Sequence, residues 1–286
     1  MTPEPFHLHL PQTISSAVVF SSPHSGRDYP ARFSAESSLD SVTLRSSEDA
    51  FVDQLFSGCL NHGAPLIAAS APRAYVDLNR SAEELDPSVV AGARSIGLNP
   101  RIASGLGVIP RVVSEGRPIQ SGKISMDEAR ARLNRYYFPY HAQLQDLLDT
   151  ARAAFGEVLL IDCHSMPHEA LAQSAGLFGK MPEVVIGDRF GSSCRTDYVA
   201  EIERFFRVEG FRTGRNTPFA GAHITQSYGR PSSGQHVIQI EVDRSLYLEE
   251  KTVTKSASFE PMRQKLSRVI SKICKMMDRP LQVAAE

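Results

Sequence analysis

The stretch from Glu157 to Pro167 reads EVLLIDCHSMP, and it decides the fold that the sequence predicts. Residues 158–161 form an unbroken apolar run, which is typical of a strand buried on both faces. Polar residues follow at once, with Asp162 and His164 two positions apart, before the proline ends the strand. Ligands of open α/β sheets bind at the carboxyl ends of such strands. The pattern therefore presents an imidazole with a carboxylate that can orient it, although His164 can equally be a structural histidine bonded to a neighbour.

A second strand end has the same pattern. Residues 17–21 (AVVFS) predict a short apolar strand, which leads into the sequence Ser-Pro-His-Ser-Gly at 22–26. Pro23 and Gly26 predict a tight turn, so His24 is presented by a constrained backbone. Two histidines at strand ends favour a shared metal ion.

Two acidic residues are candidates for the same site. Residues 45–63 predict a helix with Asp49 in its first turn, where the carboxylate can be a metal ligand or a surface acid that compensates the helix dipole. Residues 235–243 (QHVIQIEVD) alternate, with Glu241 among branched apolar residues. Glu241 then lies either on the solvent face of an edge strand or in a functional cleft.

Arginines follow another predicted strand. Residues 73–78 (RAYVDL) alternate like a half-buried strand and deliver Asn79 and Arg80. A guanidinium suits a planar carboxylate because it donates two parallel hydrogen bonds, although Arg73 and Asp77 can also form a surface salt bridge. Residues 81–123 are rich in Gly, Pro and Ser and predict an excursion over the sheet edge, in which a lid over the active site is one interpretation.

The remaining periodicity completes an α/β pattern. Ser125 can cap a long helix over 125–155 that Pro139 should kink or split, and His141 within it is expected to be packed or on the surface rather than a ligand. Further strands are predicted at 65–69 and 184–187, and further helices at 196–209 and 254–277.

Composition narrows the class of protein. The chain has 286 residues, a formal net charge of -1 and 42% hydrophobic residues, which describes an ordinary globular protein with no electrostatic footprint for nucleic acid or membrane. No apolar run reaches a membrane-spanning length, and no secretory signal is visible. Four dispersed cysteines predict free thiols and a cytoplasmic location.

Together these residues predict metal-assisted hydrolysis. A catalytic zinc commonly takes three protein ligands from His and Asp/Glu and leaves a position for water. His24, Asp49 and His164 would be the ligands, and Glu241 the base that accepts the proton of the water and passes it to the leaving nitrogen. The residues lie far apart in the chain, so their spacing alone does not establish the site.

Several blocks in the same order resemble the N-formylglutamate amidohydrolase family. They cover most of the chain and read SSPHSG (21–26), SEDAFVDQL (47–55), RAYVDLNR (73–80), LLIDCHSMP (159–167), GRNTPFAG (214–221) and QIEVDRSLYLEE (239–250). The resemblance implies a three-layer α/β/α sandwich around a mixed, largely parallel sheet, similar in fold to zinc carboxypeptidases and related deacylases, as a single catalytic domain over 1–286.

The resemblance also implies the roles of residues. One Zn²⁺ per chain would be held by His24, His164 and an acid, either Asp49, which we prefer, or Glu48. Glu241 takes the place of the catalytic glutamate, and Asn79 and Arg80 match the pair that holds a substrate carboxylate in the peptidase relatives. We expect further contacts to the substrate from Arg73, Arg111, Asn216 and Arg244.

The implied reaction is the hydrolysis of N-formyl-L-glutamate to formate and L-glutamate, a step of histidine breakdown. The chain departs from the family pattern after Phe219, where Ala220-Gly221-Ala222-His223 replaces a Gly-Gly-Tyr step. The acyl group, the native metal, the oligomeric state and the role of His223 therefore stay open. The alternatives are a metal-dependent deacylase or carboxypeptidase acting on another N-acyl amino acid or small peptide, and a metal-free binding protein that retains the fold.

Overall fold

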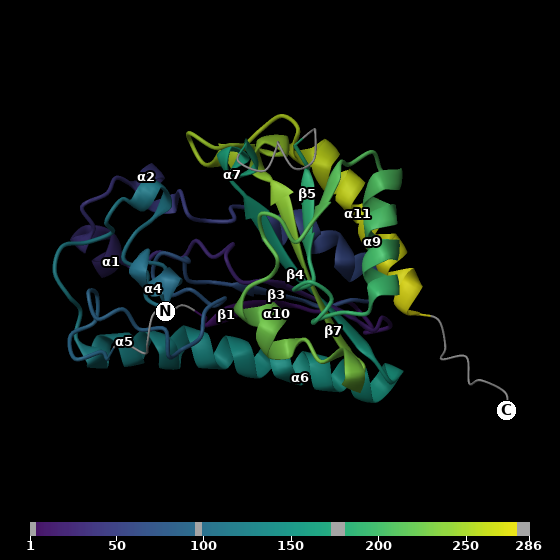
Figure 1. Cartoon of the computed structure of the whole chain (residues 1–286), viewed down its shortest axis with the longest axis horizontal. Helices are drawn as coiled ribbons and strands as arrows, with labels where there is room; N and C mark the ends of the chain where they lie inside the picture. Colours follow the sequence, from purple (N-terminus) through teal and green to yellow (C-terminus); the bar gives the residue numbers. More distant parts are fainter. Residues whose placement is uncertain (1–3, 95–98, 173–180, 279–286) are drawn as a thin grey trace, which may run out of the picture.

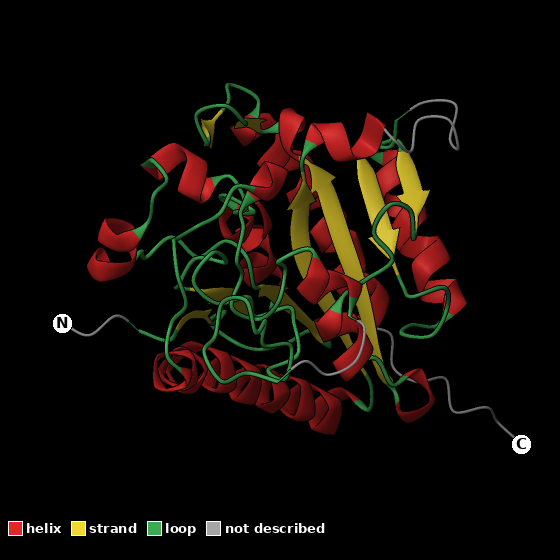
Figure 2. Cartoon of the chain, turned by 60° about the vertical axis from the view of Figure 1, so that its left-hand side comes forward, coloured by secondary structure: helices red, strands yellow, loops and turns green. Residues whose placement is uncertain are grey.

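A seven-stranded sheet forms the centre of the molecule (Figures 1 and 2). The structure is a computed structural model and describes residues 4–94, 99–172 and 181–278. In spatial order the strands are β1 (Phe6–His9), β3 (Leu66–Ala69), β2 (Val18–Ser22), β4 (Val158–Met166), β7 (Gln235–Asp243), β5 (Val184–Gly187) and β6 (Thr213–Arg215). A two-stranded ribbon of β8 (Leu248–Glu249) and β9 (Thr254–Lys255) lies outside this sheet.

The sheet is mixed and largely parallel, as the sequence predicted. Four of its neighbouring pairs are parallel: β3 with β2, β2 with β4, β4 with β7, and β5 with β6. The pairs β1 with β3 and β5 with β7 are antiparallel. Because β5 covers the far side of β7, the strand that carries Glu241 is internal rather than at an edge.

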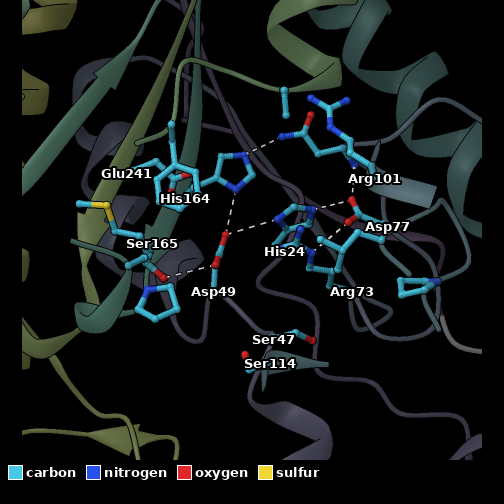
Figure 3. Close-up of a pocket in the computed structure, with 18 of the residues that line it drawn as sticks. His24, Ser47, Asp49, Arg73, Asp77, Arg101, Ser114, His164, Ser165 and Glu241 are labelled. Atoms are coloured by element: carbon cyan, nitrogen blue, oxygen red, sulfur yellow. Dashed lines mark hydrogen bonds and ion pairs between the residues drawn. The ribbon is translucent and has the colours of Figure 1, made fainter. Parts of the chain in front are cut away.

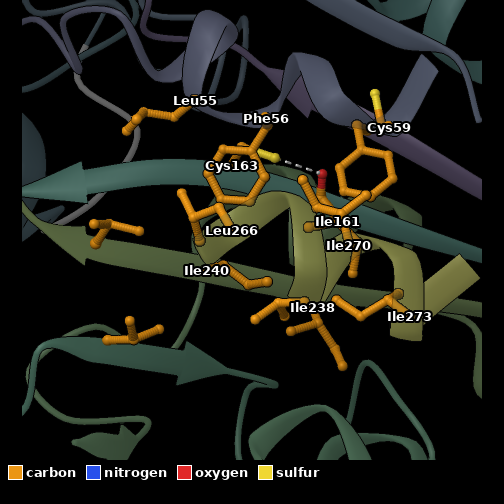
Figure 4. Close-up of a cluster of buried hydrophobic side chains, with 14 of the residues drawn as sticks. Leu55, Phe56, Cys59, Ile161, Cys163, Ile238, Ile240, Leu266, Ile270 and Ile273 are labelled. Carbon is orange, nitrogen blue, oxygen red and sulfur yellow. Dashed lines mark hydrogen bonds between the residues drawn. The ribbon is translucent and has the colours of Figure 1, made fainter. Parts of the chain in front are cut away.

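Helices cover both faces of the sheet, which makes a three-layer α/β/α sandwich. One face packs on α3 (Val52–Phe56), the following 3₁₀ helix (Ser57–His62), α9 (Thr196–Val208) and α11 (Phe259–Met277). Figure 4 shows this core, in which Phe56, Ile161 and Ile240 come together with residues of α11. The other face packs on α5 (Met126–Arg132), α6 (Phe138–Phe155) and α10 (His223–Tyr228). Shorter helices are α1 (Ala31–Glu36), α2 (Ser41–Arg45), α4 (Pro100–Ala103) and α7 (His168–Ala172).

The alternation of side chains along β4 and β7 assigns residues to these faces. Leu159, Ile161 and Cys163 belong to the core with α11, whereas Val158 and Leu160 belong to the core with α6. Since successive side chains point to opposite faces, Asp162 and His164 continue the α6 side of β4. Along these central strands, that face is apolar at the amino end and polar at the carboxyl end.

The helix predicted over 45–63 is present only from Val52, as α3 and the 3₁₀ helix that follows it to His62, and its first part is wrong. The chain leaves helix α2 at Arg45, and Phe51 at φ 62 adopts a left-handed conformation directly before α3. A bulky residue in this region of φ/ψ space interrupts an α-helix. Asp49 therefore lies in a non-helical segment, where its backbone N–H donates to the carbonyl of His24 at 3.0 Å.

The predicted strand over 73–78 is also wrong. The N–H groups of Tyr75 and Val76 both donate to the carbonyl of Pro72, which makes a turn, and the N–H of Asp77 donates to Val108. These bonds satisfy the backbone locally, so no strand ladder forms. The closing helix begins at Phe259, later than the predicted residue 254.

The long helix predicted over 125–155 is present, and a π-helical segment divides it just before Pro139. Ser125 accepts a hydrogen bond from the N–H of Glu128 and caps α5. A π-helical segment, Leu133–Tyr137, then joins α5 to α6, and Pro139 lies at the start of α6. The prolyl ring is tolerated there because the first turn of a helix does not need its N–H.

Two further findings concern the cysteines and the membrane. The four cysteines are free, as predicted, and all four are buried. Within the described part of the chain, none of the helices combines the length and apolar character that crossing a bilayer requires.

The packing of the α6 face can be tested with one substitution at two places. Val19 is fully buried in β2, whereas Val208 at the end of α9 is 60% exposed. We expect Val19→Ala to lower the free energy of unfolding by about 2 kcal/mol, because it removes buried methyl groups and leaves a cavity. The same change at Val208 should alter it by less than about 0.5 kcal/mol. Urea unfolding measures both, and equal shifts in midpoint would contradict the assignment.

Candidate active site

A cavity of about 720 Å³ opens over the carboxyl ends of the central strands (Figure 3). Its floor is formed by polar residues on the α6 side of β4 and β7, among them His164, Gln239 and Glu241. Loop residues from 99–116 and 218–222 form much of its wall. The segment 81–123 thus contributes to the pocket, while its role as a lid stays a prediction.

His24 is fixed by the turn that follows β2. Gly26 lies so close to the backbone oxygen of Ala71 that any Cβ there would collide with it. The carbonyl of His24 accepts the N–H of Asp49, so two segments 25 positions apart meet through their backbones. The backbone around His24 is thereby fixed at the pocket, where the side chain of His24 is 3% exposed.

His24, Asp49 and His164 come together as the sequence predicted. One ligand atom from each lies within 4.8 Å of the others, and all three residues are buried. The Oδ2 atom of Asp49 lies 2.8 Å from Nδ1 of His164 and 3.5 Å from Nδ1 of His24. The two imidazole rings have centroids 4.8 Å apart. Figure 3 shows Asp49 between the two histidines.

Carboxylates behind the two rings select the nitrogen that faces the cluster. Nε2 of His24 lies 2.7 Å from Oδ1 of Asp77, and Nε2 of His164 lies 3.0 Å from Oδ2 of Asp162. An imidazole that donates from Nε2 keeps the lone pair of Nδ1 for a metal, an arrangement common around bound zinc. Among the described residues, Nδ1 of His24 is buried without a hydrogen-bond partner. Two imidazoles and one carboxylate are a ligand set that suits a zinc ion, and the unpartnered nitrogen of His24 fits such a ligand role.

The second oxygen of Asp49 is anchored from the other side. Oδ1 accepts from Nη2 of Arg244 at 3.0 Å and lies 3.4 Å from the hydroxyl of Ser165. The alternative ligand Glu48 faces elsewhere, with its carboxylate bonded to Tyr29 and Arg45. The geometry therefore favours Asp49 as the acid of this cluster.

Glu241 lies beside the cluster in the next strand. The parallel register pairs His164 with Glu241, so both side chains point to the same face of the sheet. Oε1 of Glu241 accepts from the side-chain amide of Gln239 at 2.8 Å, and that amide in turn accepts the N–H of Ala222. Burial raises the pKa of Glu241 to about 7, although the positive charge of His164 opposes the shift. A carboxylate with such a pKa can take up and release a proton near neutral pH.

Burial does not have the same net effect on the pKa of every carboxylate in the site. It dominates for Glu241, whereas charges and hydrogen bonds outweigh it for Asp49 and Asp77. Burial alone would raise the pKa of Asp49, but the hydrogen bond from His164 and the nearby imidazole of His24 hold it well below its ordinary value. Likewise, the charges of His24 and Arg73 outweigh burial and hold the pKa of Asp77 well below its usual range. Against the effect of burial, Asp162 and Asp49 raise the pKa of His164 well above its ordinary value.

Four of the six residues predicted to contact the substrate line the pocket, and they differ in the groups to which they are bonded. Arg80 lines the pocket, with Nε and Nη1 bonded to the carbonyls of Leu106 and Asn79. Asn79, Arg73 and Arg244 also line it, but their polar atoms bond to neighbouring protein groups, as in the 2.9 Å bond from Arg73 to Asp77.

Arg111 and Asn216 are not on the pocket wall, contrary to the expected contacts. Nε of Arg111 donates to the buried carboxylate of Asp86 at 3.2 Å. Asn216 has φ 58, and its amide bonds to both the backbone and the side chain of Asp188. Both side chains are thus bonded to other protein groups, and neither is among the residues that line the cavity.

Three residues of the site were not assigned from the sequence. Gln239 could have been found, because it lies two positions before Glu241 and so shares its face of β7. Asp77 orients His24, but the apparent alternation of residues 73–78 predicted a strand there, and Arg101 lines the pocket from the short helix α4, which has no clear periodicity. His141, by contrast, is packed as predicted, with bonds to Tyr228 and to the carbonyl of Leu78.

The fold and this pocket define a class: an α/β protein with a candidate metal centre of two histidines and one carboxylate beside a buried glutamate. The profile of the N-formylglutamate amidohydrolase family matches residues 16–248, and the chain belongs to that family.

Two relatives and a solved structure agree with this assignment. The chain is 32% identical over 210 residues to an N-formylglutamate deformylase of Pseudomonas putida, a match that covers 71% of each chain. It is 28% identical over 242 residues to an N-formylglutamate deformylase of Pseudomonas aeruginosa, covering 82% of this chain and 83% of the relative. The crystal structure of an N-formylglutamate amidohydrolase from Ralstonia eutropha JMP134 superposes with a TM-score of 0.88 at 32% identity, over 96% of this chain and 99% of that one.

The support that Asp77 gives to the site can be measured as stability. Asp77→Asn replaces the oxygen that faces Arg73 with a donor, which leaves a largely buried guanidinium without its partner. We expect a loss of about 2–4 kcal/mol in the free energy of unfolding. Asp149→Asn, which breaks an exposed pair with Arg152, should cost less than about 0.5 kcal/mol. Chemical unfolding of both variants measures the two losses. An Asp77→Asn protein as stable as the wild type would contradict the supporting role of Asp77.

Proposed function

We propose that this protein hydrolyses the formyl amide of N-formyl-L-glutamate, giving formate and L-glutamate, with one zinc ion held by His24, Asp49 and His164. The observation that carries the proposal is the convergence of these three ligand atoms within 4.8 Å, in a pocket that Glu241 also lines. The family membership and the names of the two deformylase relatives support the choice of substrate.

The chain prepares the metal site through its outer hydrogen bonds. Asp77 and Asp162 bond to Nε2 of the two histidines, and Arg244 holds Oδ1 of Asp49, so the three inner donors are oriented in advance. A zinc ion bound by this set supplies Lewis-acid chemistry, which polarises a carbonyl and lowers the pKa of water.

Glu241 performs the proton transfers in this proposal. Its carboxylate accepts a proton from the attacking water, whose oxygen forms the new bond to the formyl carbon. The C–N bond then breaks, and Glu241 delivers the same proton to the departing amine. Gln239 keeps Oε1 of Glu241 oriented, since its own amide is fixed by the N–H of Ala222.

The substrate is positioned by its charge. Arg80 offers a guanidinium whose two bonded nitrogens contact neutral carbonyls, so its positive charge is available to a substrate carboxylate. The pocket walls at 99–116 and 218–222 surround that carboxylate and exclude part of the solvent, which strengthens the ion pair.

Removal of the proton acceptor should abolish turnover with little effect on binding. We expect Glu241→Gln to lower kcat by about 10³-fold or more while KM changes little, because the amide retains the shape of the side chain. Formate release measured under saturating substrate tests this. Gln226→Glu on α10, outside the pocket wall, serves as a comparison and should retain activity. Wild-type kcat in Glu241→Gln would refute the assigned role.

Metal dependence is tested separately. Formate release should be lost after dialysis against a chelator and restored by Zn²⁺. His24→Ala and His164→Ala should each lose stoichiometric zinc, measured by elemental analysis, whereas His141→Ala should retain it. Full activity of a metal-free preparation would reject the zinc site. Hydrolysis of other N-acyl amino acids or dipeptides, in preference to N-formylglutamate, would favour the alternative deacylase or carboxypeptidase.

A further inference from the structure

Four arginines line the pocket, and they differ in how their charge is compensated. Arg73 contacts Asp77 at 2.9 Å, and Arg244 contacts Asp49 at 3.0 Å. Both carboxylates are buried, so these two guanidinium groups are neutralised and fixed in orientation. They support the metal ligands rather than a substrate.

The other two arginines have no such partner at hydrogen-bond distance. Arg80 reaches Asp77 only at 4.0 Å and donates instead to the neutral carbonyls of Leu106 and Asn79. Arg101 reaches Glu84 only at 3.8 Å. Among the described lining arginines, these two therefore have acidic neighbours only beyond hydrogen-bond distance, so an anionic ligand competes with a longer ion pair for their charge.

Arg80 and Arg101 are close enough to influence each other. The carbonyl of Leu106, five residues beyond Arg101, accepts the hydrogen bond from Nε of Arg80. Burial lowers the pKa of Arg80, and the positive charges of Arg73 and Arg101 lower it further, against the opposing charge of Asp77. A bound anion would relieve this repulsion. In Figure 3, Arg101 is labelled on the Asp77 side of the pocket, away from Glu241 and Ser165.

We propose that Arg101 binds the side-chain carboxylate of the substrate and so selects dicarboxylic N-formyl amino acids, while Arg80 binds the α-carboxylate. This inference rests on the proposed function and names the residue that sets its specificity. The α-carboxylate is near the reacting amide, which suits Arg80, 9% exposed and adjacent to the residues that support the metal ligands. The γ-carboxylate is farther from the amide, which suits Arg101, 39% exposed on the wall.

The experiment compares two substrates that differ only in charge at the γ-position. N-formyl-L-glutamate has a carboxylate there and N-formyl-L-glutamine a neutral amide of the same size. We expect Arg101→Met to lower kcat/KM for N-formyl-L-glutamate by about 30- to 100-fold, mainly through KM, with less than about 3-fold change for N-formyl-L-glutamine. Arg101→Lys should restore part of the loss because it keeps the charge.

Two controls separate specificity from damage to the site. Arg130→Met on α5, where the guanidinium is 68% exposed, should leave both substrates unaffected. Arg80→Met should impair both substrates similarly, because each has an α-carboxylate. Equal losses for the two substrates in Arg101→Met, or no loss for either, would overturn the role of Arg101.

The failure of the proposed function would look different. In that case the wild-type protein would release no formate from N-formyl-L-glutamate. Isothermal titration of the same two compounds into wild type and Arg101→Met would then decide the inference alone. Tighter binding of the dicarboxylate that disappears in Arg101→Met supports it, and equal affinity for the two compounds in wild type refutes it.

Discussion

The parallel register between β4 and β7 is the constraint on which the site depends. It sets Asp162 opposite Gln239 and His164 opposite Glu241 along nine paired residues. Because side chains alternate along a strand, a slip of one residue would turn Glu241 toward the α11 core and bring Ile240 into the pocket. The apolar side chains of Ile238, Ile240 and Val242 prevent this slip, since the opposite face requires them. The hydrophobic core thus fixes the position of the polar side chains that line the candidate site.

Buried charge is the second feature that shapes the molecule. Asp49, Asp77 and Asp162 are each at most 1% exposed, and each is bonded to histidine, arginine or asparagine. Such buried networks seldom add stability over an apolar core of similar volume. Their benefit here is orientation, because each outer carboxylate or guanidinium fixes one atom of an inner ligand. The site is therefore organised before any ligand binds, and the apolar cores on both faces of the sheet supply the stability that it requires.

The sequence predicted the strands of the site better than the loops that complete it. Apolar runs such as 158–161 identify buried strands, and parallel strands bring their carboxyl ends to one edge, so His24, His164 and Glu241 could be grouped. The segment with Asp49 was predicted as a helix because its apolar spacing is helical, but the left-handed Phe51 breaks it. Asp77 lies in a turn whose backbone bonds to Val108, a contact distant in sequence, and Arg101 lies in the four-residue helix α4, which is too short to give a periodic pattern. Asn79 and Arg80 were singled out at the end of a predicted strand that does not form, and the family resemblance pointed to the same pair.

The site takes its fixed groups from strand ends and its wall from loops, and there is a physical reason for this division. The same reason applies to the segment after Phe219, where the sequence differs from the family pattern. Strand ends are held by hydrogen-bonded ladders and suit atoms whose geometry must be fixed, whereas loops can vary the wall that contacts a substrate. His223 lies just beyond the wall residues 218–222, and its Nε2 is 3.0 Å from the hydroxyl of Tyr137. That hydroxyl donates to the carbonyl of Arg80, so His223 must donate to the tyrosine oxygen. A change after Phe219 thereby reaches the backbone of Arg80, which lines the pocket, although His223 is not itself among the lining residues.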